Sequence, residues 1–391
     1  MGDQGFAGFD IHAADARDGA EHVWARMRDQ PGLARCSLYG GFHVAARYDD
    51  LMTVLMKPDL FASGEGITLP AATVRSPHIP AEVDPPRHRD YRALLTRFLT
   101  PGAVRAMEPR VRRLVTELLD RFADRTQVDF VEVFARPLPV HASLDLVGLP
   151  PEDAPLLDAL VVELHEEVAT GVRTGAAARL TDYVTDAVRA AAADPSDRDD
   201  LMASIVGGSV AGRPLTLDEQ VSMIRLLLIG GFDTTAIALA TALWWLAGHP
   251  GDLARLRAEP GLIDGFIEEV VRFTSPSTYL RRVATSEVDL GGTRLRPGDQ
   301  LLAAFGAANR DPAKFDRPDE ILLDRKPNPH LGFGAGHHRC VGSFFAKLEM
   351  RVAIEELLAR YDGFAVDPDR PVRLASGLNQ GIASLPLILR R

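Results

Sequence analysis

A cysteine, two histidines and four glycines lie together in the segment GFGAGHHRCVG, residues 332–342. Cys340 is one of only two cysteines in the chain, so its role does not depend on a disulfide framework. The other, Cys36, lies in a strand-like run and is expected to be a small, half-buried apolar side chain. Two distant cysteines also suit a reducing cytosol. The chemistry to explain is that of a single thiol among glycines.

Three kinds of chemistry suit such a thiol. A zinc site built from His337, His338 and Cys340 is disfavoured, because adjacent residues do not readily converge on one tetrahedral ion. A nucleophilic cysteine requires a lowered pKa and a base, and a helix start can supply the first. A thiolate ligand to haem iron requires a rigidly held sulfur with backbone N–H groups nearby.

The glycines around the cysteine favour the haem ligand. Gly334, Gly336 and Gly342 allow tight turns, positive φ angles and close passage of the backbone past a flat macrocycle. The next residues, VGSFFAKLEMRVAIEELL, have the pattern of an amphipathic helix. The sulfur is therefore expected near a helix N-terminus, where the helix dipole favours negative charge.

The apolar stretch MIRLLLIGGFDTTAIALATALWWLAG, residues 223–248, predicts a long buried helix. Arg225 and Asp233 enclose only seven uncharged residues, whereas a bilayer span needs about twenty apolar residues. The central GGFDTT places glycines, an acid and hydroxyls where core packing favours Leu and Ala. Such exceptions inside a core usually mark a functional site.

The whole chain reads as mainly α with small β-sheets, in one domain over residues 1–391 with an irregular N-terminal arm over 1–23. Helical periodicity covers six ranges: 104–122, 154–168, 176–193, 217–246, 262–273 and 341–361. Strands are expected over 37–46, over 279–304 and as a pair near the C-terminus within GLNQGIASLPLIL.

Composition limits the class of partner and the location. The net charge of −10 and pI near 5.6 speak against nucleic-acid binding. The polar, acidic start MGDQGFAGFD lacks the apolar core of a signal peptide or anchor. The sequence therefore predicts a cytoplasmic protein that binds neither nucleic acid nor membrane.

The stretch FGAGHHRCVG resembles the haem-thiolate signature of the cytochrome P450 family. Every fixed position of that signature is met, at Phe333, Gly336, His338, Cys340 and Gly342. The resemblance implies that these residues bind haem b and that Cys340 is the axial ligand of its iron. It also implies the cytochrome P450 fold, with a long central helix over the haem. It extends from about residue 24 to the C-terminus and is closest to soluble bacterial members.

GGFDTT resembles the oxygen-binding bend of that central helix. The resemblance implies that Gly230 and Gly231 leave room for O2, and that Thr234 donates a hydrogen bond on the oxygen side of the haem. Asp233 is then expected to relay protons from solvent. Two protons are needed for the release of water, and a hydroxyl–carboxylate relay suits that task.

Cations for the two haem carboxylates are implied in three places. DPPRHRDYRALL resembles the helix that reaches these carboxylates, with His88 and Arg92 one turn apart on one face. YLRRVAT adds Arg282, and the cysteine segment adds His338. Charge-assisted hydrogen bonds would join these side chains to the carboxylates.

EEVVRF resembles the helix that carries the buried ion pair of the family, here Glu269 and Arg272. The third, basic member of that network is missing from its usual place, which Glu320 occupies. The chain either pairs Glu320 with Arg272 or recruits Arg310 or Arg325.

The resemblance implies that electrons come from NAD(P)H through a separate ferredoxin-type donor and its reductase. No Gly-rich dinucleotide motif follows a strand, and the length leaves no room for a reductase domain. Arg339, Lys347 and Arg351 could form a basic docking patch on this acidic protein. A solvated helix face explains the same residues equally well.

Three other functions fit the sequence less well. A peroxide-driven haem peroxygenase leaves the Asp233–Thr234 pair without a task, because peroxide already carries its protons. A haem-binding or sensor protein without turnover needs no such relay. A cysteine hydrolase predicts a colourless protein.

The resemblance places the substrate pocket in the loop over 67–78, the central helix, SPSTYL and GLNQG. A largely apolar, medium-sized substrate with a hydrogen-bonding group is expected, such as a terpenoid or an intermediate of secondary metabolism. Hydroxylation is the default reaction. The expected pocket residues are Ile67, Leu69, Val74, Leu228, Thr278, Leu378 and Asn379.

Overall fold

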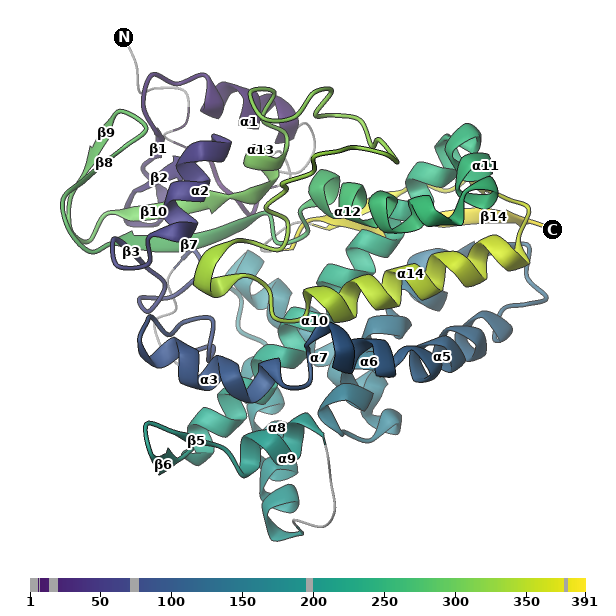
Figure 1. The fold of residues 1–391 in the computed structure, drawn as a ribbon, viewed down its shortest axis with the longest axis horizontal. Helices are drawn as coiled ribbons and strands as arrows, with labels where there is room; N and C mark the ends of the chain where they lie inside the picture. Colours follow the sequence, from purple (N-terminus) through teal and green to yellow (C-terminus); the bar gives the residue numbers. More distant parts are fainter. Residues whose placement is uncertain (1–5, 7, 14–19, 71–76, 195–199, 376–378) are drawn as a thin grey trace.

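The computed structural model describes residues 6, 8–13, 20–70, 77–194, 200–375 and 379–391. Helices make up most of it, and α10 runs through the middle of the molecule (Figure 1). The helices are α1 (Ala20–Arg28), α2 (Tyr48–Met56), α3 (Arg87–Thr96), α4 (Pro101–Ala106), α5 (Glu108–Asp120), α6 (Pro137–Val147), α7 (Ala154–Thr170), α8 (Ala176–Ala193), α9 (Leu201–Val206), α10 (Leu217–Gly248), α11 (Pro250–Ala258), α12 (Ile263–Thr274), α13 (Phe305–Asn309) and α14 (Ser343–Arg360).

The strands form small sheets. A five-stranded sheet has the order β1 (Ala34–Cys36), β2 (Phe42–Ala45), β10 (Gln300–Ala304), β7 (Tyr279–Ala284) and β3 (Phe61–Ala62), and lies beside α1, α2 and α13 (Figure 1). A three-stranded sheet has β14 (Pro386–Arg390) between β11 (Gly363–Val366) and β4 (Gln127–Asp129). Three pairs complete the set: β12 (Arg373–Ala375) with β13 (Gly381–Ser384), β5 (Ser209–Val210) with β6 (Arg213–Pro214), and β8 (Val288–Leu290) with β9 (Thr293–Leu295).

The central helix α10 begins at a capping box. The Thr216 hydroxyl accepts the Glu219 backbone N–H, and the Glu219 carboxylate accepts the Thr216 backbone N–H. The helix contacts α6, α8, α12 and α14 on its different sides. Its length and hydropathy would allow it to cross a membrane, but 67% of that stretch is buried inside the protein. It is the buried core helix that the sequence predicts.

Most predicted helices are confirmed within a few residues, but three expectations were wrong. The helix expected over 104–122 is two helices that meet at Met107, because Pro109 lacks an N–H and starts a new helix as its second residue. The N-terminal arm is shorter than expected, since α1 starts at Ala20. The two C-terminal strands β13 and β14 do not pair with each other, because each joins a different sheet. That residues 1–391 form a single domain stays a prediction.

Candidate active site

One cavity brings together most of the residues that the sequence singles out. The loop before α14 contributes Phe333, His338, Cys340 and Gly342, and α10 contributes its own side chains from one face. The cavity is lined mainly by apolar groups from α3, α6, α10, α14 and the loops between them. Residues named from the sequence that border it are Ile67, His88, Arg92, Gly230, Gly231, Thr234, Arg282, Phe333, His338, Cys340 and Gly342.

Cys340 is held in a tight loop whose sulfur faces this cavity. Its backbone N–H donates to the Phe333 carbonyl at 2.8 Å, which closes the loop. The cysteine is exposed only because it opens onto the cavity, which lies inside the protein. Burial raises the pKa of the Cys340 thiol, while backbone N–H groups of Gly342 and Ser343 and the charge of Arg92 lower it. A thiolate here therefore needs a further cation beside it, which a metal ion would supply.

Two glycines of this loop have different tasks. Gly334, with φ +67°, borders the cavity. Gly336, expected at the cofactor, does not border it among the described residues. A Cβ on Gly336 would lie 2.5 Å from the Leu55 carbonyl oxygen, so its role is to let the loop pack against the end of α2. That Gly336 binds the cofactor stays a prediction.

Two arginines and two histidines gather at one end of the cavity, and none of them forms an ion pair within the described part of the chain. Arg282 is only 4% exposed, and its side chain donates to the Arg281 carbonyl. The His88 and His338 rings lie 4.4 Å apart between centroids. Arg92 donates to the carbonyls of His337 and Arg339 at 3.2 and 2.6 Å, which ties α3 to the cysteine loop.

Burial and mutual repulsion lower the pKa values of side chains in this cluster. Burial, together with neighbouring positive groups, lowers the pKa of His338 to about 3 and that of His88 to about 4. Burial also lowers the pKa of Arg282 to about 10. Buried positive groups are usually paired with anions. The cluster therefore fits a ligand with carboxylates at this end, as a haem has.

Thr234 and Asp233 point in different directions from α10. Thr234 borders the cavity, and its hydroxyl donates to the Gly230 carbonyl at 3.0 Å. Asp233 is buried and is not among the described residues that line the cavity. Its carboxylate contacts Arg136 at 2.9 Å and the His165 ring. The acid and the alcohol are thus neighbours in sequence without sharing one face of the helix.

Asp233 belongs to a network that the sequence analysis missed. Arg136, at the start of α6, also pairs with Asp158 of α7 at 2.7 Å, and His165 comes from the same helix α7. Burial raises the pKa of Asp233, but the hydrogen bond from His165 and the charges of His165 and Arg136 outweigh it and hold that pKa below its usual range. No local pattern could have indicated this network, because its partners lie about 70 and 100 residues away.

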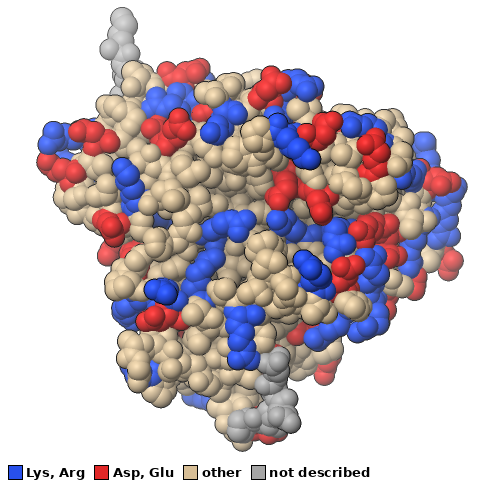
Figure 2. All heavy atoms as spheres, viewed as in Figure 1, with Lys and Arg blue, Asp and Glu red and all other residues tan. Residues whose placement is uncertain are grey.

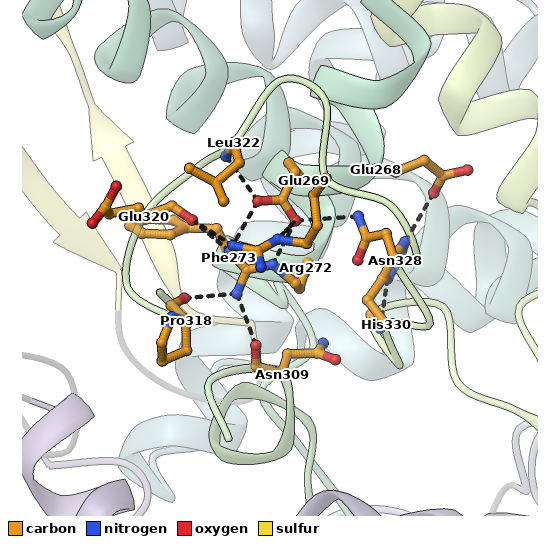
Figure 3. Close-up of polar contacts among 12 residues, drawn as sticks. Glu268, Glu269, Arg272, Phe273, Asn309, Pro318, Glu320, Leu322, Asn328 and His330 are labelled. Atoms are coloured by element: carbon orange, nitrogen blue, oxygen red, sulfur yellow. Dashed lines mark hydrogen bonds and ion pairs between the residues drawn. The ribbon is translucent and has the colours of Figure 1, made fainter. Parts of the chain in front are cut away.

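The ion pair of α12 lies outside the cavity and joins distant loops (Figure 3). Arg272 donates to both carboxylate oxygens of Glu269, at 2.6 and 3.1 Å, and both residues are fully buried. Further donors reach Glu269 at 2.9 Å from the Leu322 N–H and at 3.1 Å from the Asn328 amide. Arg272 also donates to the carbonyls of Asn309, Pro318 and Glu320 (Figure 3).

The third basic member of this network is Arg325. Its Nε lies 2.8 Å from Glu269 Oε1, and its side chain is 7% exposed. Glu320 contributes only its backbone carbonyl, and its carboxylate faces Arg317 at the surface. Arg310 instead pairs with Asp319 and the Phe273 carbonyl. Of the alternatives left open by the sequence, recruitment of Arg325 is the one observed.

The basic patch expected near the cysteine is only partly free. Lys347 pairs with Glu268 at 2.8 Å, and Arg351 pairs with Glu108 and Glu355. Arg339 remains exposed, with a long contact to Ser343. Figure 2 nevertheless shows Lys and Arg side chains gathered in a band across the face that carries α3 and α14 in Figure 1.

Of the expected substrate-pocket residues that the structure describes, only Ile67 borders the cavity, and the role of all of them in substrate binding stays a prediction. Leu228 is fully buried and is not among the cavity-lining residues of α10, which are 226, 227, 230, 231, 234, 235 and 238. Leu69 packs in the core near Trp24, and the Thr278 hydroxyl donates to the Ser275 carbonyl. Asn379 accepts a hydrogen bond from Ser277, which itself borders the cavity. Val74 and Leu378 lie outside the described residues.

Comparisons with known proteins agree with this geometry. The family model of cytochrome P450 matches residues 172–386. Putative cytochrome P450 126 of Mycobacterium tuberculosis is 35% identical over 368 residues, 90% of this chain and 88% of that protein. Cyclomarin C epoxidase CymV of Salinispora arenicola is 33% identical over 358 residues, 88% of this chain and 90% of that protein.

Solved structures give the same result for the fold. The hydroxylase HmtN, a post-tailoring enzyme of himastatin biosynthesis, has a TM-score of 0.84 and 32% identity over 97% of this chain and 100% of its own. The chain therefore belongs to the cytochrome P450 family and is a haem-dependent monooxygenase of the bacterial type.

Proposed function

We propose that this cytochrome P450 inserts one oxygen atom of O2 into an apolar, medium-sized intermediate of secondary metabolism, by hydroxylation as the default reaction. Its electrons come from NAD(P)H through a ferredoxin-type donor and its reductase, and it works in the cytoplasm. The observation that carries the proposal is the cavity that Cys340 shares with the Gly230–Thr234 face of α10. The same cavity is bordered by the arginines and histidines at positions 88, 92, 282 and 338.

The proposed cofactor site uses residues from four segments. The Cys340 thiolate would hold the iron, with N–H groups of Gly342 and Ser343 tempering its charge. His88, Arg92, Arg282 and His338 would hold the two carboxylates. Bound there, the haem supplies the activation of O2 and the oxidation itself. The protein supplies orientation, exclusion of water and protons.

Thr234 and Asp233 are proposed to handle protons. The Thr234 hydroxyl borders the cavity and is oriented by its bond to the Gly230 carbonyl. Asp233 lies one residue earlier but is turned toward Arg136 and His165. Proton transfer through Asp233 therefore begins from a carboxylate tied into a network with α6 and α7.

The substrate class rests on the cavity and on the relatives. The cavity has apolar lining residues in Ile67, Leu226, Leu227 and Leu280. The hydroxyls of Ser277 and Thr234 are polar groups of the same lining. CymV is named for epoxidation of cyclomarin C, and HmtN for a hydroxylation in himastatin biosynthesis. A medium-sized, mainly apolar metabolite with a few hydrogen-bonding groups suits this lining.

Absorption spectroscopy of the purified protein tests the cofactor assignment. The reduced, carbon-monoxide-bound form should show the spectrum of a thiolate-ligated haem. Cys340→Ser should abolish that spectrum, while Cys36→Ser, the other cysteine of the chain, should leave it unchanged. A folded protein that takes up no haem when supplied with it would overturn the proposal.

Turnover assays separate the remaining alternatives. Candidate metabolites are first screened for a shift of the haem spin state on binding. We expect product from NADH, ferredoxin and reductase. Product from peroxide alone would show a peroxygenase, and binding without any product would show a carrier or sensor protein.

A further inference from the structure

Residues 8–13, called here the N-terminal strap, are attached to the rest of the protein although they belong to no helix or strand. Ile11 is only 2% exposed. The Asp10 carboxylate accepts hydrogen bonds from the Tyr39 hydroxyl at 2.5 Å and from the His12 backbone N–H at 2.9 Å. Fixing an irregular segment costs conformational entropy, so these contacts must favour one path of the strap over the protein.

Two neighbouring residues of the strap bind two segments that are far apart in sequence. His12 Nε2 lies 2.6 Å from the Leu69 carbonyl oxygen. A carbonyl has no proton to donate, so Nε2 carries the proton of this hydrogen bond. The Ile11 carbonyl accepts a hydrogen bond from the Gln380 side-chain amide at 3.1 Å, and Gln380 is 7% exposed. The strap thus joins the chain at Leu69 to the chain at Gln380.

Both of these segments continue directly into the wall of the cavity. Ile67, two residues before Leu69, borders the cavity. The Gln380 backbone N–H donates to the Pro276 carbonyl at 2.9 Å, and Pro276 also borders the cavity. The two hydrogen bonds of the strap therefore hold two parts of the wall that come from opposite halves of the sequence.

A third contact of the strap is apolar. The Phe9 ring packs edge-on against the ring of the buried Tyr279, with 6.2 Å between the ring centroids. Leu280, the next residue of β7, borders the cavity. Within the described residues, the strap itself does not line the cavity. It can act on a ligand only through the wall segments that it holds.

We propose that the N-terminal strap holds the cavity wall around Ile67 and Pro276 in one arrangement, and that His12 and Gln380 are positioning residues for ligands that fill the cavity. The proposal rests on the monooxygenase function proposed above, because it concerns the wall of the same cavity. A wall that is fixed before the ligand arrives need not be ordered on binding, so less affinity is lost. Loss of either hydrogen bond should weaken the binding of bulky ligands and spare small ones.

Titration of the haem-loaded enzyme with two azoles tests the inference. Imidazole and clotrimazole both bind iron through a nitrogen and shift the haem spectrum, but only clotrimazole is bulky enough to press on the cavity wall. His12→Ala and Gln380→Met should each raise the Kd of clotrimazole about 3- to 10-fold, as expected for one lost hydrogen bond, and leave the Kd of imidazole unchanged. His12→Gln, whose side-chain amide can donate from the same place, should restore the Kd of the parent.

The double variant, with His12→Ala and Gln380→Met together, tests whether both residues act through one strap. Two side chains that hold the same element should not have additive effects, so the double variant should resemble the stronger single variant. Fully additive effects on the Kd of clotrimazole would contradict the inference. His22→Ala, which changes an exposed histidine of α1, is the matched control and should bind clotrimazole like the parent.

Hydrogen exchange of backbone amides follows the strap without use of the haem spectrum. Gln380→Met should speed exchange in residues 64–70, because a strap released at Ile11 holds the Leu69 carbonyl less firmly. His22→Ala should leave this exchange unchanged. Exchange in residues 64–70 that stays at the rate of the parent in Gln380→Met would show that the strap does not connect the two segments.

The outcomes separate this inference from the proposed function. A parent enzyme whose spectrum shifts with both azoles, but whose His12 and Gln380 variants keep the Kd of the parent for clotrimazole, overturns the role of the strap alone. A parent whose spectrum responds to neither azole lacks the haem site, which overturns the proposed function itself.

Discussion

At the scale of single residues, Asp233 and Thr234 show how little sequence adjacency says about shared chemistry. Successive helical residues point about 100° apart, so the hydroxyl reaches the cavity while the carboxylate reaches α6 and α7. The resemblance to the family indicated both residues and could not show that Arg136 and His165 hold the acid. Each residue is therefore tested by itself.

Thr234→Ala should divert reducing equivalents from product to peroxide, because the hydroxyl that faces the cavity is lost. The ratio of peroxide formed to NADH consumed measures this uncoupling. Thr241→Ala, on the same helix but bonded to the Ile237 carbonyl in the core, should keep the ratio of the parent. Full coupling in Thr234→Ala would remove Thr234 from the proton path.

Asp233→Asn should lower kcat on the order of 10²-fold with substrate binding retained, since the amide keeps the shape but cannot take up and release a proton. Spin-state titration measures binding, and NADH-driven product formation measures kcat. Asp145→Asn, which alters only an exposed pair of α6 with Arg110, is the control. Equal kcat in the Asp233 variant and the parent would show that protons take another route.

At the scale of elements, α12 owes its place to a buried network rather than to a single pair. Glu269 and Arg272 are three residues apart and meet on one face of the helix. Arg325, Asn328 and the Leu322 N–H come from the loop that follows α13 and attach this loop to the helix. The paired side chains do not line the cavity, although Val271 of the same helix does.

Alanine variants of the two arginines and of Glu320 should lose different amounts of folding free energy. Arg272→Ala leaves Glu269 without its main buried partner and should destabilise the protein by about 3 to 5 kcal/mol. Arg325→Ala should cost about 1.5 to 3 kcal/mol, because one charged contact is lost. Glu320→Ala, whose carboxylate is exposed, should change stability by less than about 0.5 kcal/mol. Urea unfolding measures all three, and a large effect of Glu320→Ala would contradict this assignment.

The stabilisation that comes from the contact between α12 and α14 should depend on pH, because Glu268 takes part in it. Burial raises the pKa of this carboxyl, but hydrogen bonds from His330 and Lys347 outweigh it and lower the pKa from 4.5 to about 2. A lowered pKa means that the stabilisation is complete above about pH 4.5 and is lost as the pH falls toward 2.

Glu268→Gln should therefore lower the free energy of unfolding by about 1 to 2 kcal/mol near neutral pH, allowing for the partial exposure of the pair. The difference from the parent should shrink as the pH falls below about 4.5. Urea unfolding across this range measures it. Glu287→Gln, in an exposed pair with Arg294, should show little difference at any pH.

At the scale of the whole molecule, charge is distributed unevenly. The net charge is −10, yet Lys and Arg gather on the face formed by α3 and α14 (Figure 2). Lys347 and Arg351 are neutralised by carboxylates, so the candidate docking surface depends more on exposed cations such as Arg89 of α3 and Arg339. Such a surface steers an acidic donor protein at low ionic strength.

Arg89→Glu should slow electron transfer from a ferredoxin-type donor several-fold at low salt, with haem content unchanged. The difference should diminish as salt screens the charges. Stopped-flow reduction of the haem measures the rate. Arg189→Glu on α8, also exposed, is the control, and an equal effect of both variants would rule out docking at α3.

By itself the sequence determined the family, the helix-rich fold and the loop around Cys340. These depend on contiguous residues, because turn chemistry, helical periodicity and a short signature act over a few positions. The tertiary structure decided which distant groups meet. It placed Arg136 and His165 on Asp233, Arg325 on Glu269 and the Leu55 carbonyl under Gly336. Burial and ion pairing depend on how segments remote in sequence pack together, and no local pattern carries that information.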